Sequence, residues 1–331
     1  MPRQWTAQEL SSLAREFQPA CLLLAGAELD VFGTLAAGAM TAGQLAERLQ
    51  TDPPATAVLL DALAATGLLV KEAGRYGLAG GVGDVLAAGA ETSRLPMMRH
   101  LANCLRSWAQ LARVVKTGRP ADCPPSVRGE AADLEAFVEA MGVASRAAAP
   151  EVVSDIGPPA FRHLLDVGAG PGTWTIAFLR AAPDATATLY DVPGAMPVAR
   201  RHLAEAGLLD RVDLVAGDFY ADEALPAGAD LAWVSAIVHQ NTRPQNRELF
   251  AKVHAALASG GRILLRDVVM DASRTSPAAG AMFAVHMLVR SGGGTFTFEE
   301  LRADLLAAGF TDPKLLRRNA GMSSVVQATR P

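Results

Sequence analysis

The stretch HLLDVGAGPGT, from His163 to Thr173, decides the fold. An apolar run that ends in Asp166 is followed at once by Gly168, Gly170 and Gly172 and then by the helix-like TWTIAFLRAA, which predicts strand, glycine turn and helix. Glycine removes Cβ atoms where a ligand must approach the backbone. A purely structural turn needs fewer glycines, so the pattern favours a binding loop and leaves the class of ligand open.

Two details limit the class of ligand. The dinucleotide fingerprint G-x-G-x-x-G needs glycine where this chain has Thr173, and no G-K-[ST] lysine is present for a phosphate cradle. The D-x-G-x-G-x-G turn resembles the first motif of class I S-adenosylmethionine-dependent methyltransferases. The resemblance implies S-adenosyl-L-methionine as cofactor, held by Asp166, Gly168, Gly170 and Gly172.

The chain from Phe161 onward alternates strand and helix patterns, which predicts a doubly wound parallel α/β sheet. The helix predicted before the fifth strand, within 245–261, ends in a glycine cap. The last two strand patterns, PKLLRRNA and SSVVQATR, are too close for a crossover helix, so the last strand should run antiparallel. With these features the chain resembles, over nearly its whole length, the small-molecule O-methyltransferase family. The resemblance implies a Rossmann-like seven-stranded methyltransferase sheet and an N-terminal winged-helix dimerisation domain.

Three regions are expected: a winged-helix-like domain over 1–92, connecting and pocket helices over 93–150, and the cofactor-binding catalytic domain over 151–331. Helix, turn, helix and wing patterns fill 42–80. Between Thr41 and Gly80 the sequence has three basic and four acidic residues, and this balance favours dimerisation over DNA binding. In the connecting helices, Phe137 and Met141 could line a pocket for a flat apolar substrate or could belong to plain core.

The composition limits which partners and which compartment are expected. The 331 residues are half apolar and carry a net charge of −4, which argues against a nucleic-acid partner or an anionic membrane surface. Three scattered cysteines fit a reducing compartment, and no export signal or membrane span is visible, so we expect a cytoplasmic protein. No spacing of His, Cys and carboxylate residues indicates a metal.

Residues at the ends of the next strands complete a nucleoside site. Asp191, followed by Val192, ends the second strand, where a carboxylate can accept hydrogen bonds from both ribose hydroxyls, or can simply be a solvated acid. The family resemblance implies that Asp218 meets the adenine amino group and that Phe219 packs on the ring. Ser235 stands where the family often has a further cofactor contact, although a small hydroxyl there could also be core.

His239 is the candidate catalyst. It follows the fourth strand, at the edge where open α/β sheets assemble their sites, and an imidazole can take a proton from a phenol during methyl transfer. The family usually continues its histidine with Asp and Trp, whereas here Gln240 and Asn241 follow, so a structural histidine is the alternative. Asp267, near the end of the fifth strand, either orients His239 or pairs with Arg266.

A late helix in AMFAVHMLVR corresponds to one that faces the acceptor in relatives. It carries Met282, Phe283, His286 and Met287 as pocket candidates, with His286 either a second acid or base or a core residue. The following SGGGTFT is a turn that could close over the site.

Together these features predict methyl transfer to a hydroxyl of a small aromatic or polyketide-like molecule by a homodimer. The alternatives are C- or N-methylation and a protein that binds the cofactor for other chemistry. From other classes, a nicotinamide oxidoreductase and a winged-helix regulator are disfavoured by Thr173 and by the acidic balance.

Overall fold

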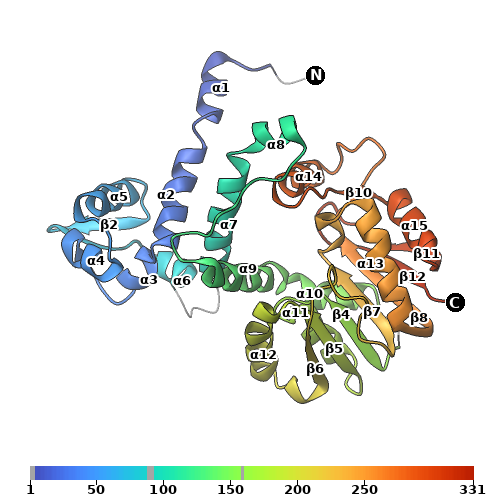
Figure 1. Ribbon diagram of the computed structural model, residues 1–331. Helices are drawn as coiled ribbons and strands as arrows, with labels where there is room; N and C mark the ends of the chain where they lie inside the picture. Colours follow the sequence, from blue (N-terminus) through green and yellow to red (C-terminus); the bar gives the residue numbers. More distant parts are fainter. Residues whose placement is uncertain (1–3, 88–92, 158–159) are drawn as a thin grey trace. The chain divides into compact units, whose positions relative to one another are not determined.

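The computed structural model describes residues 4–87, 93–157 and 160–331 (Figure 1). The chain forms two compact units, of which unit 1 comprises Met1–Leu105 and Pro124–Val143 and unit 2 comprises Arg106–Cys123 and Ala144–Pro331. Each unit is considered by itself below. Within the described ranges, no helix has both the length and the apolar character needed to span a membrane.

Unit 2 is organised by a seven-stranded sheet in the order β11-β12-β8-β7-β4-β5-β6. Its central strands are buried on both faces and read as continuous apolar runs, as parallel strands covered by helices require. The strands are β4 (His163–Val167), β5 (Thr186–Asp191), β6 (Val212–Ala216), β7 (Ala229–Ser235), β8 (Leu257–Asp267), β11 (Thr311–Arg317) and β12 (Ser324–Thr329). The predicted α/β sheet is confirmed.

The last strand reverses direction. β12 pairs antiparallel with both β8 and β11, while β4, β5, β6, β7 and β8 pair in parallel. The short connection between β11 and β12 dictates this reversal, as predicted. The expected glycine cap after the helix in 245–261 is wrong: α13 ends at Ala256 and the chain passes directly into β8, which contains Gly260 and Gly261.

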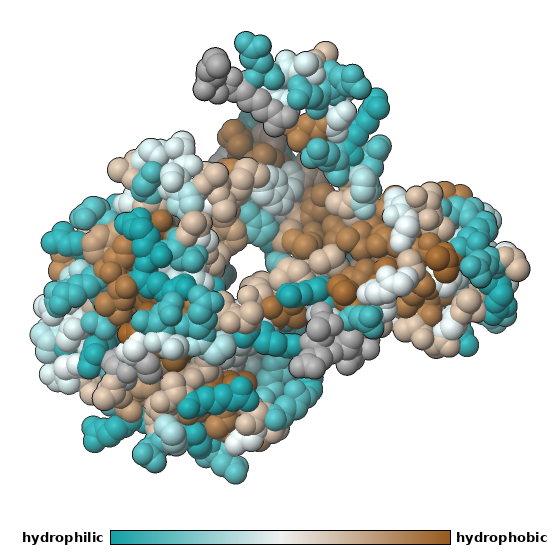
Figure 2. Space-filling model, turned by 180° about the vertical axis from the view of Figure 1, so that it is seen from behind, coloured by the Kyte–Doolittle hydropathy of each residue, from teal (hydrophilic) through white to brown (hydrophobic). Residues whose placement is uncertain are grey.

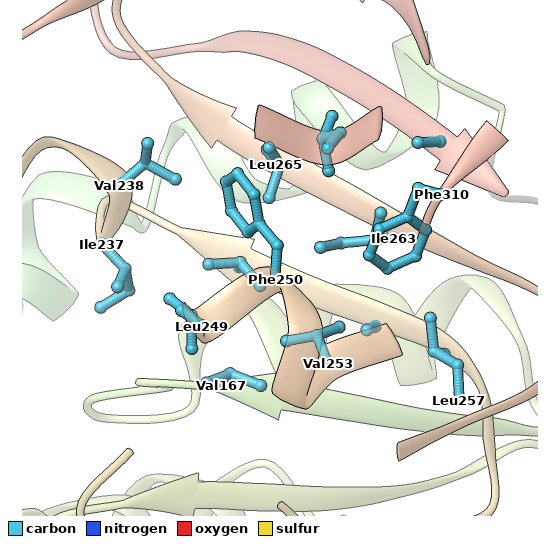
Figure 3. Packing of buried hydrophobic residues seen from close by; sticks show 14 of the residues in the cluster. Val167, Ile237, Val238, Leu249, Phe250, Val253, Leu257, Ile263, Leu265 and Phe310 are labelled. Atoms are coloured by element: carbon cyan, nitrogen blue, oxygen red, sulfur yellow. The ribbon is translucent and has the colours of Figure 1, made fainter. Parts of the chain in front are cut away.

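Helices cover both faces of the sheet (Figure 1). One face packs under α13 (Arg243–Ala256) and α15 (Phe298–Ala307), where Phe250 and Val253 meet Ile263 and Leu265 in the cluster of Figure 3. The other face packs under α10 (Ala148–Asp155), α11 (Thr173–Ala181) and α12 (Met196–Glu205). These two apolar layers fix the strand order, and with it the row of strand ends that carries the site.

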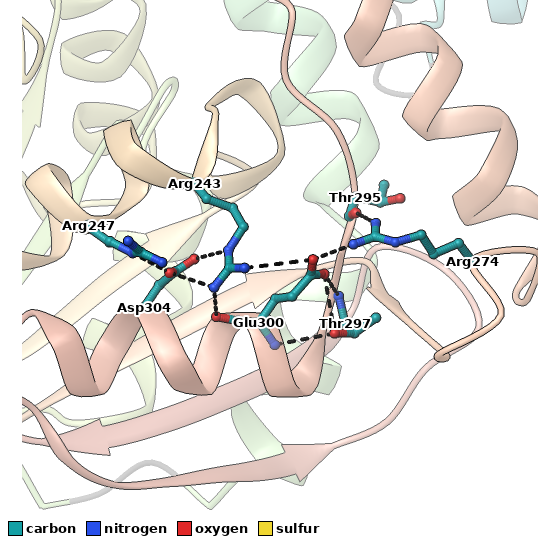
Figure 4. A network of polar contacts seen from close by, with 7 residues as sticks. All are labelled: Arg243, Arg247, Arg274, Thr295, Thr297, Glu300 and Asp304. Atoms are coloured by element: carbon teal, nitrogen blue, oxygen red, sulfur yellow. Dashed lines mark hydrogen bonds and ion pairs between the residues drawn. The ribbon is translucent and has the colours of Figure 1, made fainter.

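A polar network ties α13 to α15 at the rim of the first layer (Figure 4). Asp304, whose side chain is almost fully buried, accepts hydrogen bonds from Arg243 and from Arg247 at 2.6 to 2.9 Å. Glu300 of the same helix pairs with Arg274 and caps α15 through Thr297. A buried carboxylate is stable here because guanidinium groups satisfy it.

The remaining elements of unit 2 are short or lie beside the sheet. They are α8 (Leu111–Thr117), α14 (Ala278–Arg290), the parallel pair β9 (Val269–Met270) and β10 (Phe296–Thr297), and three 3₁₀ turns, η1 (Pro193–Ala195), η2 (Leu209–Arg211) and η3 (Val238–Gln240).

Unit 1 has the predicted pattern of helix, turn, helix and wing. Thr41 caps α4 through a capping box with Gln44, and Pro53 opens α5, so the sequence signals and the helix starts agree. The wing strands pair antiparallel, and β1 joins them. The elements are α1 (Ala7–Leu13), α2 (Phe17–Glu28), α3 (Val31–Leu35), β1 (Met40–Thr41), α4 (Ala42–Leu49), α5 (Pro53–Ala65), β2 (Leu69–Glu72), β3 (Arg75–Leu78) and α6 (Val82–Leu86). Two more helices, α7 (Leu95–Trp108) and α9 (Glu130–Ser145), run across the unit boundaries.

Candidate active site

The glycine turn after β4 lies at the carboxyl edge of the sheet, next to the ends of β5 and β7. Gly168 has φ +66°, and a Cβ atom there would lie 2.5 Å from Ile237 Cδ1 and 3.7 Å from the Phe219 ring. Only glycine allows this conformation at this spacing. The turn is therefore held tightly against the segments that follow β6 and β7.

Asp191 is joined to the glycine turn. Its carboxylate accepts the N–H of Gly170 at 2.6 Å and the N–H of Val192 at 2.7 Å. The side chain stays partly exposed, so the second lone pair of each oxygen can still receive a ribose hydroxyl. Burial raises the pKa of Asp191, whereas the two backbone N–H groups lower it.

Asp166 is different because its side chain is almost fully buried and accepts the Thr175 hydroxyl at 2.6 Å. Burial raises its pKa to about 7. The carboxyl group thus links the end of β4 to the first turn of α11, which fixes the two ends of the glycine turn relative to each other.

The loop after β6 places Asp218 and Phe219 beside the glycine turn. Lys252 from α13 donates to the carbonyl oxygens of Phe219 and Asp222 at 2.8 and 2.7 Å, and Asp218 accepts the N–H of Tyr220. The Phe219 ring packs against the Tyr220 ring in a tilted arrangement, with ring centroids 4.4 Å apart. An acid and an aromatic ring therefore follow β6, the strand next to the one that Asp191 ends.

His239 and Asp267 form a buried pair. His239 Nδ1 lies 2.9 Å from Asp267 Oδ1 and 3.0 Å from Oδ2, and the His239 backbone N–H also donates to Oδ2. Their side chains are only 7% and 4% exposed. Because an ionised carboxylate can only accept, Nδ1 is the nitrogen that donates to Asp267, and in the neutral imidazole Nε2 is then the nitrogen with the lone pair.

The turn that presents His239 is strained. Ala236, directly after β7, has φ +59°, a left-handed conformation that costs a non-glycine residue about 1 kcal/mol. It redirects the chain into η3, and its N–H bonds to the Arg266 carbonyl oxygen. Gln240 and Asn241 also serve this turn: Gln240 donates to the Ala236 carbonyl, and buried Asn241 donates to Asn246. The residues that replace the family's Asp and Trp therefore hold the histidine loop.

Helix α14 supplies the neighbours of His239. The Phe283 ring meets the imidazole edge-on with centroids 4.7 Å apart, and His286 stacks next to Phe283 at 5.6 Å. Trp108 Nε1 donates to His286 Nδ1 at 2.9 Å, and burial lowers the pKa of His286 to about 4. His286 is therefore uncharged at neutral pH.

The other pocket candidates are dispersed. Met287 is buried and Met282 is mostly exposed, both on α14. Phe137 and Met141 lie on α9 in unit 1, where Phe137 packs against His100. Ser235 is buried and accepts from Arg266. Among the described residues, no group of three His, Cys, Asp or Glu side chains is placed to hold a metal ion.

Several residues at the site gave no separate signal in the sequence. Lys252 hydrogen-bonds to a residue 33 positions away, and Thr175 to one 9 positions away. Neither spacing belongs to a local motif. Trp108 reads as one member of an apolar helical stripe, although it bonds to a residue 178 positions later.

A parallel sheet with a reversed last strand, and a strand-end carboxylate joined to a glycine turn, defines the class I methyltransferase type of cofactor site. The O-methyltransferase domain matches residues 126–311, and the O-methyltransferase dimerisation domain matches residues 13–87. The chain belongs to this O-methyltransferase family and is an S-adenosylmethionine-dependent methyltransferase.

Individual relatives align over nearly the full chain. The 3-hydroxy-5-methyl-1-naphthoate 3-O-methyltransferase of Streptomyces sahachiroi is 29% identical, covering 97% of this chain and 94% of its own. The N,N-dimethyltransferase OxyT of Streptomyces rimosus is 28% identical, covering 92% and 90%. The structure of human N-acetylserotonin methyltransferase in complex with S-adenosylmethionine superposes with a TM-score of 0.75 at 22% identity, covering 100% and 99%.

The glycine segment after α14 packs on the backbone of His239. A Cβ atom at Gly293 would lie 2.2 Å from the His239 carbonyl oxygen and 2.5 Å from the Gln240 carbonyl carbon. Gly294 donates its N–H to the same His239 oxygen at 2.9 Å, yet a Cβ atom there meets nothing within 4 Å. The segment therefore braces the histidine loop.

We expect Gly293→Ala to lower the free energy of unfolding by about 1–3 kcal/mol, because the added methyl must displace backbone atoms. Gly294→Ala is the matched control and should change it by less than about 0.5 kcal/mol. Urea unfolding of both variants measures the difference. Equal values for the two variants would show that the contact at Gly293 relaxes without cost.

Proposed function

We propose that the protein transfers a methyl group from S-adenosylmethionine to a hydroxyl of a small aromatic or polyketide-like molecule, with His239 as general base. The His239–Asp267 pair carries the proposal. A hydroxyl is a weak nucleophile until it loses its proton, whereas a neutral amine already presents its lone pair. A buried imidazole with a free Nε2 lone pair and a fixed Nδ1–H suits the hydroxyl.

The residues present fit the cofactor. The glycine turn brings backbone to the carboxyl edge of the sheet, Asp191 offers oxygens for the ribose, and Asp218 and Phe219 follow the next strand, where the adenine would lie. When bound, S-adenosylmethionine supplies an electrophilic methyl carbon. The protein aligns the acceptor oxygen with that carbon, which accounts for much of the acceleration in such displacements.

The proton is handled by the buried pair. His239 Nε2 takes the hydroxyl proton as the oxygen–carbon bond forms and the carbon–sulfur bond breaks. Asp267 holds the ring orientation through Nδ1 and stabilises the imidazolium. Phe283 packs its apolar ring against the imidazole, which closes that side of the proposed base to water.

A methylation screen tests the activity. With labelled S-adenosylmethionine, we expect label in hydroxylated naphthalene and polyketide-like compounds, and none in the same compounds with the hydroxyl already methylated. Matched amino compounds provide the comparison with the N,N-dimethyltransferase relative. Label only in the amino compounds would overturn the hydroxyl assignment.

The His239 role has its own test. We expect His239→Ala to reduce kcat about 10²–10⁴-fold, because it removes the base. Cofactor affinity, measured by calorimetry with S-adenosylhomocysteine, should stay within about threefold. Asp267→Asn should also lower kcat, because an amide no longer selects the tautomer. An unchanged kcat in His239→Ala would remove this residue from the mechanism.

We also propose that the enzyme is a homodimer formed through unit 1. Residues 4–20 are exposed throughout, and Leu10, Leu13 and Phe17 are each about half exposed, although they are large and apolar. Figure 2 shows brown residues gathered on the surface of this unit, at the right. Exposed apolar surface of this kind marks an interface, and the matched dimerisation domain overlaps it from residue 13.

Sedimentation velocity tests the dimer. The native protein should sediment as two chains, and Leu13→Glu with Phe17→Glu should shift it to one chain, because both substitutions place charge in an apolar contact. Leu306→Glu, at a similarly exposed leucine of α15, should leave the dimer intact. A native protein that sediments as a single chain at all concentrations would contradict the proposal.

A further inference from the structure

A chain of side-chain hydrogen bonds ends at the turn that carries His239. Asn246 Nδ2 donates to the Val238 carbonyl oxygen at 3.1 Å, and Asn241 Nδ2 donates to Asn246 Oδ1 at 3.0 Å. Both asparagines are fully buried. Val238 directly precedes His239 in η3, so these bonds hold the stretch of backbone from which the imidazole projects.

The direction of every bond in this chain follows from one fixed acceptor. Because a carbonyl oxygen can only accept, Asn246 turns its NH2 group to Val238 and its Oδ1 atom to Asn241. Asn241 then directs its own NH2 group to Asn246, which leaves its Oδ1 atom facing Tyr220. The Tyr220 hydroxyl therefore donates to Asn241 Oδ1, and no other group in the described ranges donates to this oxygen.

Tyr220 connects the histidine turn to the loop after β6. The residue is half exposed and its ring packs against Phe219, yet its hydroxyl reaches the buried Asn241. The loop has an anchor of its own, because Lys252 of α13 donates to two of its carbonyl oxygens. Tyr220 therefore extends from a segment that is already fixed, and its hydroxyl can fix the position of Asn241 in turn.

We propose that Tyr220 is a positioning residue for His239. Its hydroxyl acts through Asn241 and Asn246 on the turn that presents the imidazole, and three aligned hydrogen bonds in a buried site reinforce one another. Asn241 makes this chain possible, because a tryptophan at its position would offer a donor and no acceptor for the hydroxyl. The inference rests on the proposed role of His239 as general base.

The kcat of Tyr220→Phe, measured in two backgrounds, tests the proposal. Phenylalanine keeps the ring beside Phe219 and removes only the hydroxyl, so we expect kcat to fall about 10–100-fold, as it does when a catalytic group is slightly displaced. Affinity for S-adenosylhomocysteine, measured by calorimetry, should stay within about threefold. In His239→Ala no imidazole remains to be positioned, so adding Tyr220→Phe should lower kcat by less than about twofold.

Tyr190→Phe is the matched control. The Tyr190 hydroxyl donates to Asp222 in the same loop, so its removal loosens the loop and keeps the bond to Asn241, and kcat should stay within about threefold. An equal fall in kcat in both tyrosine variants would overturn the proposal, because it would reveal a general effect of the loop. An unchanged kcat in Tyr220→Phe would also overturn it.

The two backgrounds separate this inference from the proposed function. If Tyr220→Phe lowers kcat as much in His239→Ala as in the native protein, Tyr220 does not act through His239, and the positioning role is overturned while the general base stands. The kcat of His239→Ala alone tests the base itself.

Discussion

The alternation of side chains at the end of β8 sends two adjacent charged residues to opposite faces of the sheet, because successive residues of a strand point in opposite directions. Asp267 turns towards the α13 face and bonds to His239, whereas Arg266 turns towards the α11 face and stacks on Trp174. Both residues are fixed by pairing with β12, where Val325 lies opposite Arg266 and Ser324 opposite Asp267. The reversed last strand therefore anchors both charged residues.

The cofactor side is rigid because its parts bond to each other before any ligand arrives. Asp191 joins β5 to Gly170, Asp166 joins β4 to α11 through Thr175, and Lys252 joins α13 to the loop with Phe219. Such preorganisation reduces the entropy lost on binding. A consequence is that Asp191 holds the glycine turn and, in the proposed site, also receives the ribose hydroxyls. Its replacement would disturb both.

Short-range features of the chain were predictable from sequence, and contacts between distant segments were not. The strand, glycine turn and helix from His163 to Ala181 follow from local periodicity, and the reversal of β12 follows from a connection too short for a helix. The sequence left open whether Asp267 orients His239 or pairs with Arg266, because adjacency in sequence gives no direction for either side chain. The pleat of β8 directs Asp267 towards His239 and Arg266 towards the opposite face of the sheet. Gly260 and Gly261 were expected to cap a helix, but β8 runs through them, and each bonds to the backbone of Arg330.

The neutral state of His286 bears on which of two neighbouring histidines can accept a proton. Two histidines lie around Phe283, and the His239 imidazole bonds to Asp267. Burial and, after it, the charge of Arg290 lower the pKa of His286, so a proton placed on it is disfavoured. In the proposed mechanism His239 is therefore the proton acceptor. If both imidazoles were basic, a proton on His286 would add positive charge beside His239 and weaken it as a base. Burial and Arg290 thus support the role proposed for His239, because they keep its neighbour uncharged.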